Sequence, residues 1–403
     1  MTIMVSRPIY RGQVVLVDVF AGEASEYLRS GTFRFKYDGV DLSEINESIL
    51  VLPALGAILA IAYATGVPIK VGEVDEDFAV SAEKLAKVWA GIYPTYHENG
   101  FRIIGSRIKN DTKACSRDLL LFSGGVDALA SLIKNRATVG GLLSVWGADV
   151  PLSRPELWGR LQDLLPQTTA TSGLDRFVVK TNLRRFMINE NLVRDFTGVG
   201  QGSWWMKAQH GMALLALSAP LTAAAGFSRV IIASSHSNEF HTPWGSSPET
   251  DDLVRWGNVS AKHDAFEYTR QDKLRKLIAP HLSKGERAAL AVCYKKRRGQ
   301  GETINCGTCE KCIRTATGAL VAGMNPVDLG LPVEREAIRA WRCAIESKEV
   351  KFGANELFMW QDIQRGFSES SFNYVDSELG AYLNWVREFD FSAVCISTSS
   401  SDT

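Results

Sequence analysis

The chain has 403 residues, of which 45% are hydrophobic and 22% are charged, as in an ordinary soluble globular protein. This length predicts two or three domains, and the composition excludes a chain disordered throughout, a collagen-like fibre and a coiled coil. Lys and Arg total 45, and so do Asp and Glu, so the formal net charge is zero. Neutrality argues against broad, charge-driven binding to a nucleic acid backbone, although it leaves room for a local basic patch.

The first 20 residues have no continuous apolar core followed by a small-residue cleavage site, so we expect no secretion signal and a cytoplasmic protein. Residues 49–67 are uncharged over a length that would span a bilayer. Because Pro53, Gly56 and Gly66 interrupt this stretch, we interpret it as a buried strand at 49–52 followed by a buried helix at 54–65. No membrane partner is therefore expected.

Residues 1–112 predict an N-terminal α+β domain. A β-branched run at 14–20 and an alternating run at 33–37 indicate strands, and a helical pattern surrounds residues 82–93.

Residues 113–325 predict a doubly wound, parallel α/β sheet, because short apolar runs there alternate with helical segments. The expected strands are 119–122, 142–146, 177–180, 230–233 and 288–292, and the expected helices include 126–135 and 206–225. Residues 326–403 predict a C-terminal extension with helices at 333–345, 355–365 and 377–386, followed by a disordered tail.

A glycine-rich turn follows the first strand of this region, in the order Ser123-Gly124-Gly125-Val126-Asp127. Two glycines let the backbone bend sharply, and the amides of the following helix point at one spot, where the helix dipole is positive. Such a turn binds phosphate, with the Ser123 hydroxyl as a further donor and Asp127 placed to hold Mg²⁺. The alternative is a tight strand–helix turn without a ligand. The turn is neither a Walker A nor a Rossmann sequence.

The turn resembles the PP-loop of the ATP pyrophosphatases, whose usual form is Ser-Gly-Gly-x-Asp-Ser/Thr. Ser123, Gly124, Gly125 and Asp127 match, and Ala128 stands where that family has a hydroxyl residue. The resemblance implies an adenine nucleotide alpha-hydrolase-like fold and an enzyme that splits ATP between its α and β phosphates.

Three cysteines, Cys306, Cys309 and Cys312, lie in seven residues, and Cys293 lies upstream at the end of an expected strand. Four thiolates at this spacing fit a closed, tetrahedral Zn²⁺ site that fastens the strand to the next helix. An iron–sulfur cluster and a redox CxxC motif are the alternatives.

The glycine turn and the cysteine cluster together resemble 7-cyano-7-deazaguanine synthase, the QueC family, over residues 118–320. The longer Asn-Cys-Gly-x-Cys-Glu-Lys-Cys-x-Arg-Thr run at 305–315 is more similar to the larger QueC-like proteins of bacterial anti-phage systems, Qat and type IV CBASS. This resemblance implies Zn²⁺ on Cys293, Cys306, Cys309 and Cys312, and it places Thr269 and Arg270 at the pyrophosphate. Arg270 stands where the synthase has a lysine, which keeps the charge and changes its geometry.

Other polar segments follow strand ends, where α/β sheets bind ligands. Asn182 is expected to face the nucleotide, and Thr269 to cap a helix. Trp204 and Trp205 are either a platform for a base or core residues, and His210 is expected to be an ordinary core histidine. The loop after the strand at 230–233 offers further candidates without assigned roles: His236, Glu239, His241 and Asp251.

The sequence therefore predicts an enzyme that uses ATP and Mg²⁺ to adenylate a carboxylate, of the deazaguanine type by resemblance, and to pass it to ammonia or another amine. A protein or nucleic acid acceptor, defence-system partner proteins and a homodimer are further expectations. A PP-loop thiolation enzyme acting on tRNA or a small molecule, and a catalytically weakened nucleotide-binding subunit, are the alternatives.

Overall fold

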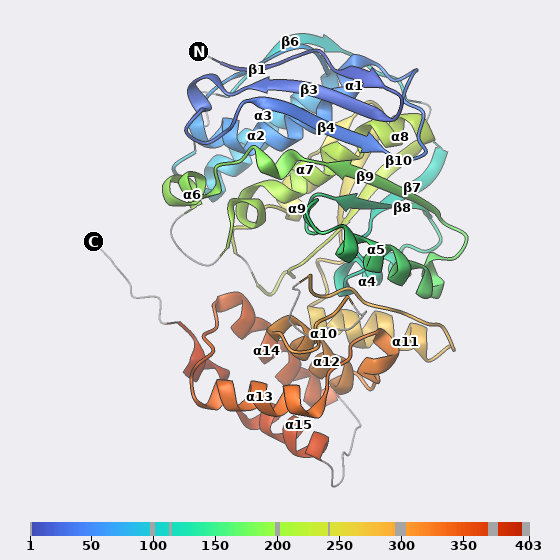
Figure 1. Ribbon diagram of the computed structural model, residues 1–403, viewed down its shortest axis with the longest axis vertical. Helices are drawn as coiled ribbons and strands as arrows, with labels where there is room; N and C mark the ends of the chain where they lie inside the picture. The colour runs from blue at the N-terminus through green and yellow to red at the C-terminus, as the bar shows by residue number, and fades with distance from the viewer. Residues whose placement is uncertain are drawn as a thin grey trace.

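One mixed β-sheet forms the centre of the first two thirds of the chain (Figure 1). The computed structural model describes residues 2–96, 101–112, 115–197, 202–240, 242–294, 304–369 and 378–396. Within these residues the sheet has 12 strands in the order β11-β12-β10-β7-β8-β9-β4-β3-β1-β5-β6, with β2 paired to β3. The strands are β1 (Ile3–Val5), β2 (Ile9–Arg11), β3 (Val14–Phe20), β4 (Gly31–Tyr37), β5 (Ile69–Asp75), β6 (Ile103–Ile108), β7 (Cys115–Leu121), β8 (Val139–Trp146), β9 (Asp175–Thr181), β10 (Phe227–Ala233), β11 (Arg255–Trp256) and β12 (Val259–Asp264).

Helices connect and cover these strands (Figure 1). The α-helices are α1 (Glu47–Leu50), α2 (Leu52–Thr65), α3 (Glu76–Ile92), α4 (Val126–Lys134), α5 (Pro155–Leu164), α6 (Asn189–Leu192), α7 (His210–Leu217), α8 (Ala219–Ala225), α9 (Pro248–Asp251), α10 (Arg270–Asp272), α11 (Ala279–Leu282), α12 (Glu310–Val321), α13 (Arg335–Glu346), α14 (Ala354–Gly366) and α15 (Glu378–Glu388).

The central strands β12, β10, β7, β8 and β9 are parallel, and they have cores on both faces. Leu119 and Leu121 of β7 belong to the core built with α2, α7 and α8, whereas Leu120 and Phe122 belong to the core built with α4 and α5. A strand buried on both faces reads as a continuous apolar run, which is why the sequence indicated it. The prediction of an α/β sheet is confirmed to this extent.

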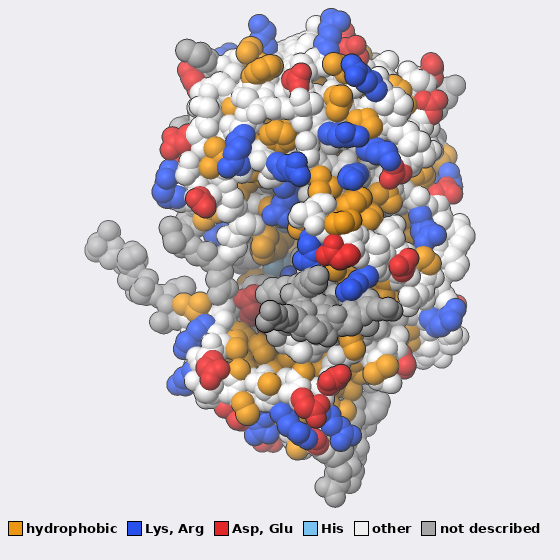
Figure 2. All heavy atoms as spheres, viewed as in Figure 1, with side chains coloured by type: hydrophobic (Ala, Val, Ile, Leu, Met, Phe, Trp, Pro, Cys, Tyr) orange, Lys and Arg blue, Asp and Glu red, His pale blue; other side chains and the backbone are white. Residues whose placement is uncertain are grey.

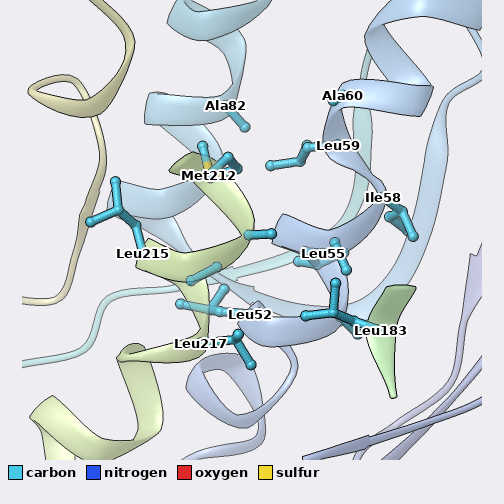
Figure 3. Close-up of a cluster of buried hydrophobic side chains, with 14 of the residues drawn as sticks. Leu52, Leu55, Ile58, Leu59, Ala60, Ala82, Leu183, Met212, Leu215 and Leu217 are labelled. Carbon is cyan, nitrogen blue, oxygen red and sulfur yellow. The ribbon is translucent and has the colours of Figure 1, made fainter. Parts of the chain in front are cut away.

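The N-terminal strands extend the same sheet. β4 pairs antiparallel with β9, with Lys36 opposite Lys180, and one hydrophobic core runs from Ile3 to Ala261. Side chains of α2 such as Leu55 and those of α7 such as Leu215 meet in this core (Figure 3). Residues 1–112 thus share both sheet and core with the region that follows.

The predicted strand at 49–52 is wrong, because this segment forms α1 and the start of α2. Every residue of α2 except Thr65 is buried, so the helix has no polar face and its sequence lacks a helical period. Pro53 sits in its first turn, where its missing N–H costs nothing. Among the described residues, none of the helices combines the length and the apolar character needed to cross a bilayer.

The predicted strand at 288–292 is also wrong. Its backbone makes no ladder: the Ala291 N–H donates to the Gly124 carbonyl at 2.9 Å, and the Leu290 N–H donates to the Leu329 carbonyl at 2.9 Å. Asn305, which is fully buried, accepts from the Val292 N–H at 2.9 Å. The segment is apolar because its side chains are buried against helices α4 and α12 and the π-helical segment 273–278.

Three predicted C-terminal helices are confirmed as α13, α14 and α15. They enclose a core of stacked aromatic rings that includes Trp341, Trp360, Phe352 and Phe391. This helical unit lies below the sheet in Figure 1. The tail predicted to be disordered lies, from residue 397 on, outside the described residues.

Candidate functional site

The glycine loop, residues Ser123 to Asp127, lies where the winding of the sheet reverses. The chain passes from β7 through α4 to β8 and through α5 to β9 on one side, whereas β10 and β12 lie on the other side of β7. In open α/β sheets, ligands bind at such a point, outside the carboxyl ends of the strands. The loop follows the carboxyl end of β7 and leads directly into α4.

Gly124 adopts a left-handed conformation with a φ of +77°. A Cβ atom at this position would lie 2.7 Å from Leu165 Cδ2, so the loop has no room for a side chain there. Gly125 is the N-cap of α4, and no side chain bonds the first-turn amides of the helix. These amides and the positive end of the helix dipole therefore fit a phosphate group.

Asp127, in the first turn of α4, accepts hydrogen bonds from two cations. Arg270 donates to Oδ2, and Lys273 donates to Oδ1 at 3.0 Å. Burial acts to raise the pKa of Asp127, but the charges of Arg270 and Lys273 outweigh it, so the pKa is lowered. Both oxygens of Asp127 thus contact cations in the structure, and the expectation that Asp127 holds Mg²⁺ stays a prediction.

Lys273 was not singled out from the sequence, because a lysine in an amphipathic helix usually points to solvent. Here its side chain is only 1% exposed, and it also donates to the Ser234 carbonyl at the end of β10. Burial lowers the pKa of Lys273 and the Asp127 charge opposes this. A π-helical segment, η7 (Lys273–Ile278), begins at this residue, a distortion that often marks functional sites.

Thr269 caps this helix as predicted, because its side chain accepts from the Asp272 N–H. It is 4% exposed and bonds within its own turn, so its role is to fix the start of the segment that carries Arg270 and Lys273.

A pocket of about 180 Å³ opens over the glycine loop. Its lining includes Ser123, Gly125, Asp127, Asp149, His210 and Tyr294. A second pocket of about 670 Å³ shares Asp149, His210 and Tyr294 with the first, and it extends to Cys293, Lys311 and the Glu356 end of α14. The two cavities therefore adjoin, one at the loop and one between the sheet and the C-terminal helices.

His210 lies at this junction and lines both pockets, while its ring stays hydrogen-bonded as expected of a satisfied core histidine. Its Nδ1 is 3.1 Å from the Trp205 carbonyl, and burial lowers its pKa. Asp149 and Tyr294 at the same junction were not indicated by the sequence, because they come from loops far apart in the chain.

The two adjacent tryptophans lie in different environments. Trp204 is fully buried in the core beside Tyr96, whereas Trp205 lines the second pocket with the Arg184 guanidinium 5.1 Å from its ring centre. Asn182 does not reach the loop, because its side chain bonds to the backbone of β4, accepting from Arg34 and donating to Thr32.

The candidate residues of the loop after β10 also occupy different environments. His236 contacts Trp244 edge to face beside a third pocket, and burial lowers the pKa of His236 to about 4. Glu239 pairs with Arg365 on the surface, and Asp251 is fully buried against His263 at 2.9 Å, so neither lines the two pockets at the glycine loop. His241 lies outside the described residues.

The four cysteines converge as predicted. The sulfur atoms of Cys293, Cys306, Cys309 and Cys312 lie within 4.8 Å of one another, with 3.5 Å between Cys293 and Cys312 and 3.9 Å between Cys306 and Cys312. Sulfurs about 2.3 Å from a tetrahedral zinc ion would be about 3.8 Å apart, so the cluster fits Zn²⁺.

The electrostatics of the cluster also favour a cation. A hydrogen bond with Cys293 raises the pKa of Cys309 to about 12, and hydrogen bonds with Cys293 and Cys309 raise the pKa of Cys312, with repulsion between neighbouring thiolates as a smaller cause. A divalent cation would favour the thiolate forms and remove this repulsion. Gly307, with a φ of +70°, lets the turn pass Pro332 closely.

The fold and site define an α/β protein with a glycine loop at the switch point of its sheet and a four-cysteine cluster beside it. Comparison of the chain with protein-family models, with curated proteins and with solved structures found no match.

Proposed function

We propose that the protein binds ATP at the glycine loop and transfers AMP to a carboxylate, as an ATP-dependent ligase of the QueC-like ATP pyrophosphatase type. The observation that carries this proposal is the glycine loop at the switch point, whose Asp127 lines the smaller of two adjoining pockets and binds Arg270 and Lys273. The smaller pocket suits the nucleotide and the larger one its partner substrate.

In the proposed reaction, an oxygen of the substrate carboxylate attacks the α-phosphorus, and the bond to the β-phosphate oxygen breaks. Pyrophosphate leaves with the electron pair, and the loop amides together with Arg270 and Lys273 stabilise its growing charge. A nitrogen nucleophile then attacks the acyl adenylate and displaces AMP, giving up its proton. Asp127 acts here by positioning the two cations, and Mg²⁺ accompanies the nucleotide.

The cysteine cluster would hold Zn²⁺ with four thiolates and no open position, so it stabilises structure and takes no part in these steps. The sequence resemblance adds a 7-deazaguanine carboxylate as substrate and anti-phage defence as the setting. No observation in the structure favours the thiolation alternative.

The test is to mix the protein with Mg·ATP and 7-carboxy-7-deazaguanine, with and without ammonium, and to measure pyrophosphate release. Substituting Lys273→Met should reduce the rate about 10²–10³-fold, the usual effect of removing one stabilising donor. The matched control is Lys276→Met, which removes a lysine from the same helix that pairs with Asp272 on the surface. Calorimetry reports ATP binding separately.

Equal rates for the two variants would reject the assigned role of Lys273. ATP binding without pyrophosphate release would instead support a weakened nucleotide-binding subunit, for which Ala128 and the fully engaged Asp127 are the structural arguments. Absence of ATP binding would reject both.

A further inference from the structure

One face of the N-terminal half of the sheet is open. Helices α2 and α3 pack on the inner face, and the opposite face exposes large apolar side chains: Met4 is 49% exposed, Ile9 47%, Phe20 51% and Ile104 44%. Figure 2 shows hydrophobic and basic side chains, with scattered acidic ones, over the upper half of the molecule, where these strands lie. Such a patch on a sheet marks an interaction surface.

Strand register places cations among these apolar residues, in three rows that run across the strands. The rows are Arg11–Val14–Lys36–Lys180, Ile9–Leu16–Arg34 and Phe20–Met4–Lys70–Ile104. We call these residues the outer sheet face. It crosses six strands from β9 to β6, a width of about 24 Å at about 4.8 Å between strands.

The outer sheet face carries a net positive charge, although the whole chain is neutral. Two further register pairs carry carboxylates, Asp18 opposite Thr32, which donates to it, and Glu73 opposite Ser106, and the five cations outnumber them. Lys36 lies directly opposite Lys180, and the repulsion between these two like charges destabilises the pairing of β4 with β9. Lys36 is partly neutralised by Asp38, and Lys180 lies 4.0 Å from the centre of the Trp146 ring. An anion bound between Lys36 and Lys180 would relieve their mutual repulsion, which favours binding of the anion.

We infer that the outer sheet face binds single-stranded nucleic acid. Phosphates would contact Arg11, Arg34, Lys36, Lys70 and Lys180, and unpaired bases would lie on the apolar side chains between them. A duplex fits less well, because its base faces are stacked inside and a flat sheet does not enter a groove. Lys36 and Lys180 lie opposite each other on neighbouring strands, and Arg34 lies two residues before Lys36, so these three cations would contact successive phosphates. An acidic protein is the competing occupant that the experiment tests. This inference is independent of the proposed ATP chemistry.

The experiment is fluorescence anisotropy of the full chain with a fluorescein-labelled, mixed-sequence 20-nucleotide single-stranded RNA. Five phosphate contacts predict that raising the salt from 50 to 200 mM weakens binding roughly 100-fold, from a slope of about −0.7 per contact. The triple variant Arg34→Ala, Lys36→Ala, Lys70→Ala should lower that slope by about 2. The matched control is Arg335→Ala, Arg339→Ala, Arg342→Ala on α13, which removes the same charge from an exposed helix face.

Loss of binding in the sheet variant but not in the α13 variant, with both folded by circular dichroism, supports the inference. Phe20→Ala should weaken binding without changing the salt slope, because it removes a base contact and no charge. The inference is overturned if the RNA does not bind at 50 mM salt or if both triple variants bind equally. Equal affinity for a duplex of the same length would also overturn the inference. Displacement of the RNA by poly-glutamate at matched charge would overturn it in favour of an acidic protein partner.

Discussion

Gly124 shows how one residue without a side chain sets the shape of the loop. Its left-handed conformation costs other residues roughly 1–2 kcal/mol, and a Cβ would also press on Leu165 Cδ2 at 2.7 Å. We predict that Gly124→Ala destabilises the fold by at least this amount and abolishes ATP binding, measured by urea unfolding and calorimetry. Gly125→Ala is the control, since its Cβ would meet atoms only at 3.5 Å and beyond. Equal behaviour of the two variants would contradict this account of the loop.

Asp127 gives the site a pH dependence whose sign follows from its lowered pKa. A carboxyl whose pKa is depressed below the unfolded value of about 3.9 stabilises the folded state above that pH, and this stability is lost as the pH falls through the folded pKa. Asp127→Asn should therefore cost roughly 3–5 kcal/mol near neutral pH, because the buried Lys273 and the half-buried Arg270 lose their carboxylate partner. The cost should shrink below about pH 4.

Urea unfolding between pH 3 and pH 7 measures this difference. The exposed Asp163, substituted to Asn, serves as the control and should leave the free energy of unfolding nearly unchanged. A cost for Asp127→Asn that stays constant across this pH range would refute the coupling of the carboxylate to Arg270 and Lys273.

At the scale of elements, the backbone of residues 288–293 hydrogen-bonds to the side chain of Asn305, whereas the backbone of a strand would hydrogen-bond to a neighbouring strand. The buried Asn305 amide donates to the carbonyls of Leu290 and Gly330 at 2.7 and 2.8 Å, and its oxygen accepts from Val292. This network holds Cys293 beside the other three cysteines.

Asn305→Ala should therefore destabilise the protein by roughly 1–3 kcal/mol for each buried group left without a partner. It should also reduce the zinc content below one ion per chain, measured by elemental analysis. Asn325→Ala, at an exposed helix cap, is the comparison. Full zinc content in Asn305→Ala would show that the cysteines assemble without this network, and iron in place of zinc would favour the iron–sulfur alternative.

At the scale of the molecule, the close packing of α2 on α7 joins the N-terminal residues to the sheet that carries the site. A Cβ at Gly56 would lie 2.3 Å from Ala216 Cβ and 3.0 Å from the Met212 carbonyl, so the helices approach as closely as glycine allows (Figure 3 shows this core).

Gly56→Ala is expected to lower the melting temperature of the whole chain in a single transition, because the core is shared. Gly159→Ala in α5 meets nothing within 4 Å and should raise stability by roughly 0.5–1 kcal/mol through helix propensity. Differential scanning calorimetry distinguishes the two. A separate N-terminal transition in Gly56→Ala would show that residues 1–112 unfold independently.

Sequence alone identified the features that depend on neighbours in the chain. The glycine loop, the cap at Thr269, the four cysteines and the C-terminal helices follow from local backbone needs and short spacings, which residue types reveal directly. The sequence also predicts the helix at 54–65, which α2 confirms. It mistakes 49–52 for a strand, because burial on all sides erases the helical period that sequence patterns use.

Only the tertiary structure decided which distant residues meet. It joined Lys273 to Asp127, directed Asn182 to β4 and brought His210, Asp149 and Tyr294 to the junction of two pockets. It also aligned the cations of the outer sheet face in a chain whose net charge is zero. The physical reason is the same in each case. The charge, burial and contacts around a side chain depend on which residues surround it in space, and strand pairing and helix packing bring together residues that are far apart in the sequence.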